Sequence, residues 1–265
     1  MYKIYLFLLL IFIPVNVAAQ SPVSDNDSES PIEISADNSL EWLQNKKQYI
    51  ANGNVIVTQD DLELKADKLV AHYDDSKAGG ASNITLLEAT GNVALKDASN
   101  KAYGDSITYD LVTDDIVLTG SNPRLIAPDQ TITATEKLTY NNKKGTARAI
   151  GNARIKTSTE TLEAQTITAQ FQKNTDGSSR QKLSTATTTG RLKITTDDEV
   201  ITGSKGTYDA IKNTATVTGN VKIIRGPNTL EGERATVNLN TNISQIFGNE
   251  KSGKRVKGVF YPKSK

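Results

Sequence analysis

The chain has 265 residues, of which 31 are basic and 30 acidic, with a single histidine and no cysteine. This near-neutral balance disfavours a nucleic-acid partner, because proteins that bind nucleic acid usually present a basic face. Without cysteine, the fold has no disulfide and must be stabilised by its own apolar core.

The first 19 residues have the pattern of a secretory signal peptide. Lys3 precedes an apolar run over residues 4–13, and the small-residue motif VAA ends at Ala19. The run is shorter than the roughly 20 residues that a membrane-spanning helix needs, so we expect cleavage after Ala19 and export of the mature chain. An uncleaved membrane anchor is the alternative. The polar residues 20–31 predict a disordered N-terminal arm.

A repeat follows the arm. Glycine recurs inside phrases such as TGNV, at Gly53, Gly91, Gly120, Gly151, Gly190 and Gly219. Asp67, Asp105, Gln165, Ser204 and Glu233 each stand 14 residues after one of these glycines, and Glu136 stands 16 after Gly120. Tyr109, Tyr140 and Tyr208 come four residues later still. The basic unit is 29 residues, and such regular spacing is typical of repeat architectures.

Apolar and polar residues alternate within each unit, which predicts strands with one buried face. Turn-forming residues separate the strands, so each unit is predicted to be two antiparallel strands. The glycines are expected to bend the strands. The sequence thus predicts an all-β fold of about 14 to 15 antiparallel strands, with the repeat domain over residues 32–248 and a basic C-terminal edge strand and tail over residues 249–265. The inward face is expected to carry Val55, Val57, Val93, Leu95, Ile107, Ala153, Ile155, Leu192, Ile194, Val221 and Ile223.

Residues suited to catalysis are scarce. His72 has no cysteine with it and is interpreted as an edge-strand residue. Four pairs of aspartates, which begin at residues 60, 74, 114 and 197, fall at predicted turns and lack the spacing of a calcium loop. No phosphate-binding or nucleophile motif is present. We therefore expect no enzyme activity, no cofactor and no metal.

The two terminal strands are expected to be unpaired edges. An unpaired edge is an aggregation hazard unless it meets a partner strand, so the ends are predicted to mediate head-to-tail self-association. The residues expected at these assembly edges are Ile32, Ile34, Val256, Val259 and Phe260. Lysines and arginines flank the C-terminal strand, either as charges that block aggregation or as contacts for an acidic or phosphorylated ligand.

Residues 32–37 (IEISAD), 62–67 (LELKAD) and 89–93 (ATGNV) resemble the LptA/OstA-like family of periplasmic lipopolysaccharide-transport proteins. The resemblance covers about residues 31–248 and departs from the family pattern at residues 122–124 (NPR) and 190–192 (GRL). It implies an elongated β-jellyroll, open along a seam, whose inward face is a lipid-binding groove for the acyl chains of lipopolysaccharide.

The resemblance also implies a role and partners. The role is that of a bridge in outer-membrane biogenesis in the Gram-negative cell envelope. The implied partners are an LptC-like inner-membrane subunit, an LptD-like outer-membrane protein and further copies of the chain. Two alternatives stay open: a membrane-anchored LptC-like subunit of the same pathway, and a structural exported β-repeat protein with no ligand.

Overall fold

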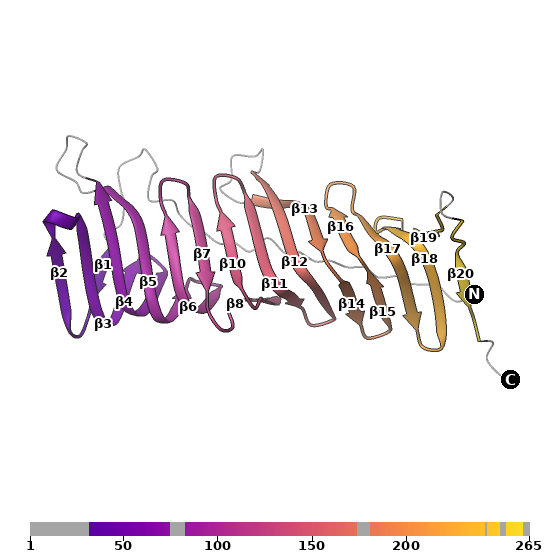
Figure 1. The fold of residues 1–265 in the computed structure, drawn as a ribbon, viewed down its shortest axis with the longest axis horizontal. Helices are drawn as coiled ribbons and strands as arrows, with labels where there is room; N and C mark the ends of the chain where they lie inside the picture. The colour runs from indigo at the N-terminus through magenta and orange to yellow at the C-terminus, as the bar shows by residue number, and fades with distance from the viewer. Residues whose placement is uncertain (1–31, 75–82, 174–180, 242, 250–252, 262–265) are drawn as a thin grey trace. The chain divides into compact units, whose positions relative to one another are not determined.

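The computed structural model describes residues 32–74, 83–173, 181–241, 243–249 and 253–261. The expected signal peptide and N-terminal arm lie outside these residues. Contacts between residues divide the described chain into two compact units, which meet between Ala147 and Arg148. Each unit is described by itself below, with labels as in Figure 1.

The first unit contains ten strands and one 3-10 turn, Gln44–Lys46. Figure 1 colours this unit from indigo to magenta. Its strands are β1 (Glu33–Ser35), β2 (Ser39–Leu43), β3 (Gln48–Gln59), β4 (Leu62–Asp74), β5 (Asn83–Lys96), β6 (Lys101–Asp110), β7 (Asp115–Thr119), β8 (Arg124–Ala127), β9 (Gln130–Thr133) and β10 (Lys137–Asn141).

The second unit contains ten further strands, the first of which begins just before the boundary. They are β11 (Thr146–Lys156), β12 (Glu160–Lys173), β13 (Gln181–Thr189), β14 (Leu192–Thr196), β15 (Glu199–Gly203), β16 (Lys205–Asp209), β17 (Thr214–Arg225), β18 (Asn228–Asn238), β19 (Ile243–Phe247) and β20 (Lys257–Val259).

Long strands are bent at the repeat glycines. Between β3 and β4 the register shifts so that two residues, Gly53 and Asn54, face the single residue Asp67. The same two-against-one bulge occurs between β5 and β6, and between β17 and β18. An extra residue in one strand bends it and increases its twist. The predicted role of the glycines as bends is therefore confirmed at these positions.

At four of the six repeat glycines the next residue is an asparagine, and both residues have positive φ. Gly91 and Asn92 have φ of 78° and 48°, a region that glycine enters freely and asparagine tolerates better than most residues. A side chain at Gly91 would collide with Asp67 on β4. Asn92 also binds that residue, because its amide donates to the Asp67 carboxylate at 2.9 Å.

The two halves of each bent strand pair in different parts of the ladder. The first half of β3 pairs with β2, and its second half pairs with β1. Inward side chains from both halves nevertheless pack into one cluster, in which Ala51 comes from the first half of β3 and Val55 from the second. The core therefore lies between the halves, which is the arrangement of a jellyroll.

The predicted fold class is confirmed: the described residues are almost entirely antiparallel strands. They contain twenty strands, more than the 14 or 15 expected, because some bent strands are interrupted at the bend. One interruption separates β7 from β8 at residues 120–123, where the sequence lacks the usual phrase. There, the Ser121 amide donates to the Asp105 carboxylate at 2.8 Å, so an aspartate at the repeat position of Asp67 also holds this bend.

Candidate functional site

The apolar interior of the first unit gathers the residues that alternation placed on one face. Val55, Val93 and Ile107 are between 1% and 8% exposed and belong to a single buried cluster. Val57 and Leu95 are half-buried and pack against it. The structure thus brings all five predicted residues of this unit together.

The second unit has an equivalent interior. The predicted residues Ala153, Ile155, Leu192, Ile194, Val221 and Ile223 are all at most 6% exposed. Ile201, which the sequence analysis missed, links two of them, because it pairs with Ile194 on one side and Ile223 on the other. Ile201 lies on β15, which follows the turn at Asp197 and Asp198 rather than a repeat phrase.

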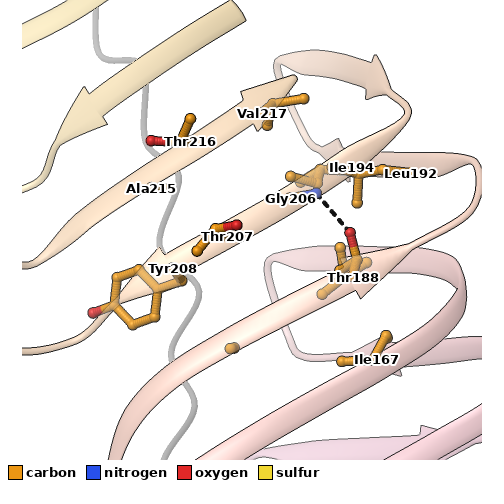
Figure 2. A pocket seen from close by; sticks show the side chains of 12 residues that line it. Ile167, Thr188, Leu192, Ile194, Gly206, Thr207, Tyr208, Ala215, Thr216 and Val217 are labelled. Carbon is orange, nitrogen blue, oxygen red and sulfur yellow. Dashed lines mark hydrogen bonds between the residues drawn. The ribbon is translucent and has the colours of Figure 1, made fainter. Parts of the chain in front are cut away.

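A small pocket opens into this second interior (Figure 2). Its volume is about 10 Å³, room for roughly one water molecule. Its wall is mostly apolar and includes Gly206, Ile167, Leu192, Ile194, Ala215 and Val217. The hydroxyl-bearing residues Thr188, Thr207, Tyr208 and Thr216 also line it. The interior at this point is close to filled by the side chains of the chain itself.

Tyrosines at the ends of the second strands hold the turns beyond them. Tyr109 donates to Asp114 Oδ1 at 3.0 Å, and Tyr208 donates to Asn213 Oδ1 at 2.9 Å. Burial raises the pKa of the Tyr109 hydroxyl, and Asp114 raises it further. The phenol therefore stays a neutral donor, so these repeat tyrosines have a structural role.

Two carboxyl side chains, one partly and one fully buried, lie at the opposite turns of the second unit. Burial raises the pKa of Glu160 from 4.5 to about 7. Burial also raises the pKa of Glu199, while Arg225, whose Nε lies 3.7 Å from Glu199 Oε2, opposes that rise. The Glu199 side chain is only 3% exposed, so this end of the interior carries carboxyl groups that resist ionisation.

The N-terminal edge of the first unit exposes apolar side chains. Ile32 is 42% exposed, and Ile34 is half-buried on β1 opposite Val57. The sequence analysis missed β2, where Leu40 and Trp42 are 62% and 56% exposed although they pair with the inward-facing Ala51 and Tyr49. The alternation of Leu40 with Trp42 was the available signal.

The C-terminal edge of the second unit is also split and apolar. β19 pairs with the second half of β18, and β20 pairs with its first half. Val256, Val259 and Phe260 are between 37% and 65% exposed, as is Ile243 on β19. Between the two strands lies Gly248, a repeat glycine that the sequence analysis missed, where an added side chain would collide with the backbone of Lys254.

The prediction that His72 lies on an edge strand is wrong. β4 is paired on both sides, with His72 opposite Gln48 on β3 and opposite Leu86 on β5. Its Nε2 lies 2.9 Å from Glu88 Oε2. The described parts of the chain contain no group of three or more histidine, cysteine or acidic residues placed to hold a metal ion. Within the same residues, no helix is long and apolar enough to cross a membrane.

Comparison of the sequence with models of known protein families identifies a match. The family model described as LptA/(LptD N-terminal domain) LPS transport protein matches residues 33–146, 131–243 and 200–258. The chain belongs to this family. Its members in that description are lipopolysaccharide-transport proteins, and the first two matches each cover most of one unit.

Individual members of the LptA/LptD N-terminal family share 30% or less of their residues with this chain in the comparisons that follow. The lipopolysaccharide export system protein LptA of Escherichia coli K12 is 30% identical over 146 residues, which are 52% of this chain and 75% of that protein. LptA of Shigella flexneri matches with the same values. Among solved structures, LptH of Pseudomonas aeruginosa, described as a periplasmic component of the lipopolysaccharide transport device, is 19% identical. It aligns with 50% of this chain and 95% of its own, with a TM-score of 0.42.

Proposed function

We propose that this protein is a periplasmic bridge component for lipopolysaccharide transport to the outer membrane, which shields acyl chains in its apolar interior. Membership of the transport family supports the pathway. The observation that carries the lipid role is the inward face: every bent strand adds apolar side chains to it, and both terminal strands leave such side chains exposed.

The interior must open for an acyl chain to enter. The pocket in the second unit holds about one water molecule, far less than a lipid chain occupies. The halves of each strand join at a bend, and separation of the halves at these bends would widen the space between them. Full burial of a twelve-carbon chain would be worth about 9 kcal/mol, so partial cover suits a carrier that must also release its lipid.

The edges support the proposed assembly. A strand edge presents unpaired N–H and C=O groups that a second strand can complete. We propose that the β1/β2 edge and the β19/β20 edge meet further copies of the chain, an LptC-like inner-membrane subunit or an LptD-like outer-membrane protein. The two edges differ in sequence, so contacts between copies would be heterologous and would form open chains.

Native mass spectrometry of the exported chain, purified from an envelope fraction, tests the lipid role. We expect bound lipopolysaccharide that survives gentle purification. A chain that carries no lipid, and takes up none when mixed with lipopolysaccharide, contradicts the proposal. N-terminal sequencing of the same sample tests cleavage after Ala19; recovery of Met1 from membranes would instead favour the anchored LptC-like role.

One observation favours a second candidate, a structural exported β-repeat protein with no ligand. The near-filled interior at the pocket of the second unit is what a packed core would show. Hydrogen exchange separates the two candidates. A carrier should lose protection in strands on both sides of the bends when lipopolysaccharide is added, whereas a ligand-free core should be unchanged.

A further inference from the structure

The repeat position two residues after each acidic or polar bend residue faces the interior. It is a large aliphatic residue in the first four instances, namely Leu69, Ile107, Leu138 and Ile167. In the last two it is Gly206 and Ala235. Both of these belong to the second unit and are buried, so the interior row loses its bulk over two successive strand pairs.

Strand pairing places the small residues in one row. Ile167 on β12 is opposite Thr188 on β13, and Gly206 on β16 is opposite Val217 on β17. Val217 is in turn opposite Ala235 on β18. A hydrogen bond joins the β12/β13 pair to the β16/β17 pair, because the Gly206 amide donates to Thr188 Oγ1 at 2.8 Å. Figure 2 shows this bond with Leu192, Ile194 and Val217 around it.

Leu192 only partly takes up the space that a side chain at residue 206 would fill. Its Cδ2 lies 3.0 Å from the place of a Cβ on Gly206. The pocket remains beside it, with Ile167, Ala215 and Val217 in its wall. Its volume of about 10 Å³ is close to the room needed by one water molecule or one methyl group. A pocket with so apolar a wall favours the methyl.

We propose that this pocket, called here the Gly206 pocket, seats the terminal methyl end of one saturated acyl chain. The proposal rests on the proposed lipid role and adds to it a preferred position within the second unit. An aliphatic chain end is chemically similar to the leucine or isoleucine side chain that stands at this repeat position in the first four instances. At the first four equivalent positions a large side chain of the protein occupies this place, whereas beside Gly206 the terminal methyl enters space that the pocket leaves open.

Photo-crosslinking with a twelve-carbon fatty acid that carries a diazirine at its terminal carbon tests the pocket in the full exported chain. Mass spectrometry of the digested protein then maps the label. We expect the label to concentrate on residues 186–194 and 206–217, and to be displaced by added lipid A. Label spread evenly over both units overturns the pocket while leaving the lipid role intact; no label anywhere contradicts the lipid role itself.

Two variants fill the pocket. Gly206→Ala should push Leu192 into the space, since a Cβ would meet that side chain and Thr188 Oγ1 rather than backbone. Ala215→Val adds methyl groups to the wall from another strand. Each should lower labelling at the pocket about fourfold, the change expected when one buried methyl group loses its place. Unchanged labelling in a folded variant overturns the proposal; if one variant fails to fold, the other and the wild-type map still decide.

A reciprocal variant serves as the matched control. Ile107 holds the equivalent position in the first unit and is 8% exposed. Ile107→Ala should create a comparable space there and draw new label to β6 and its neighbours. If the label stays where it was in the wild type, space at this repeat position does not determine where the chain end sits, and the proposal is wrong.

Discussion

The side-chain amide of Asn92 donates to the carboxylate of Asp67, 2.9 Å away on the adjacent strand. The pair joins the bend in β5 to the strand that precedes it. Asn54 and Asp37 repeat the arrangement at 2.7 Å. At both bends an aspartate that precedes the glycine in the chain binds the asparagine. Asp67 also lies opposite the bulge at Gly53 and Asn54 on β3, 14 residues after Gly53, so one residue contacts two successive bends.

We expect Gly91→Ala to lower the free energy of unfolding by about 3 kcal/mol, because it combines backbone strain at positive φ with a collision. The collision is with Asp67. Gly226→Ala is the control: its φ is also positive, at 54°, but nothing lies within 4 Å of an added Cβ. That variant should lose only about 1 kcal/mol. Urea unfolding measures both, and equal losses would show that the close approach to Asp67 has no energetic weight.

The raised pKa of Glu160 predicts that stability falls with pH. The folded chain keeps a proton up to a pH of about 7 that the unfolded chain releases near 4.5. The free energy of unfolding should therefore drop between these values and level off above, by about 1–2 kcal/mol once partial exposure of the side chain is taken into account. Urea unfolding at both ends of this range measures the drop.

Glu160→Gln should remove most of that drop, leaving the smaller contribution of Glu199, whose pKa burial also raises. Glu163→Gln removes a carboxylate from the same strand, where it makes exposed ion pairs with Arg154 and Lys193, and is the matched control. A wild-type slope that persists in Glu160→Gln would contradict the assignment.

The effect of an aspartate on the inward face should depend on how deeply the replaced side chain is buried. At a buried position it should unfold the chain, and at a half-buried position it should lower lipid binding. Val93 is 2% exposed, so Val93→Asp should unfold the first unit, because an unpaired buried carboxylate costs several kcal/mol. This differs from the expectation for an open groove, where water would reach the carboxylate. Leu95→Asp lies at a half-buried position of the same face and should leave the chain folded while lowering lipid uptake.

Thermal unfolding and native mass spectrometry measure the two effects. Ile126→Asp is the control, since Ile126 is 37% exposed on β8 in the same unit. If Leu95→Asp takes up as much lipid as this control, the inward face is not the binding surface.

We expect Phe260→Asp to weaken self-association at the C-terminal edge. Phe260 is 65% exposed directly after β20, and a charge there should repel an apolar partner edge. Ile211→Asp is the control, because Ile211 is 73% exposed at a turn away from that edge. Sedimentation velocity over a concentration range should show chains for the wild type and Ile211→Asp, but mainly monomers for Phe260→Asp. Equal behaviour of all three would contradict the assembly.

A point substitution is preferable to deletion of residues 249–265. The deletion removes β20, which pairs with Thr229, Leu230 and Glu231 of β18. It would therefore leave this part of β18 paired with β17 alone, and any loss of association could reflect local unfolding.

The sequence predicts the strands and the inward face on both sides of the repeat glycines, but on β4 the alternation changes phase at Asp67. Leu64 and Ala66 face inward on β4, and alternation would continue through Lys68. Instead Leu69 and Ala71 are buried, at 3% and 1% exposure. The bend at Asp67 turns the strand, so the next inward residue after Ala66 is Leu69, three positions later rather than two. An analysis that assumes a strict period of two cannot predict this change.

Other features depend on space rather than pattern. Gly206 occupies a position where alternation predicts an inward residue, yet only packing against Leu192 and Thr188 reveals a pocket there. Gly248 lies between β19 and β20, and the valine that follows Gly53, Gly91 and Gly219 by two residues is absent there. The division into domains over residues 32–248 and 249–265 stays a prediction.

The contact between Asn92 and Asp67 also bears on alternative alignments of these strands. Threonine-rich strands with a period of two can slide by two residues and keep the same face inward. Such a slip of β5 along β4 would move Asn92 away from its acceptor and press an ordinary side chain against Asp67 where only Gly91 fits. A polar pair in the middle of a strand therefore fixes the register. It selects one strand alignment among several that would bury the same apolar residues.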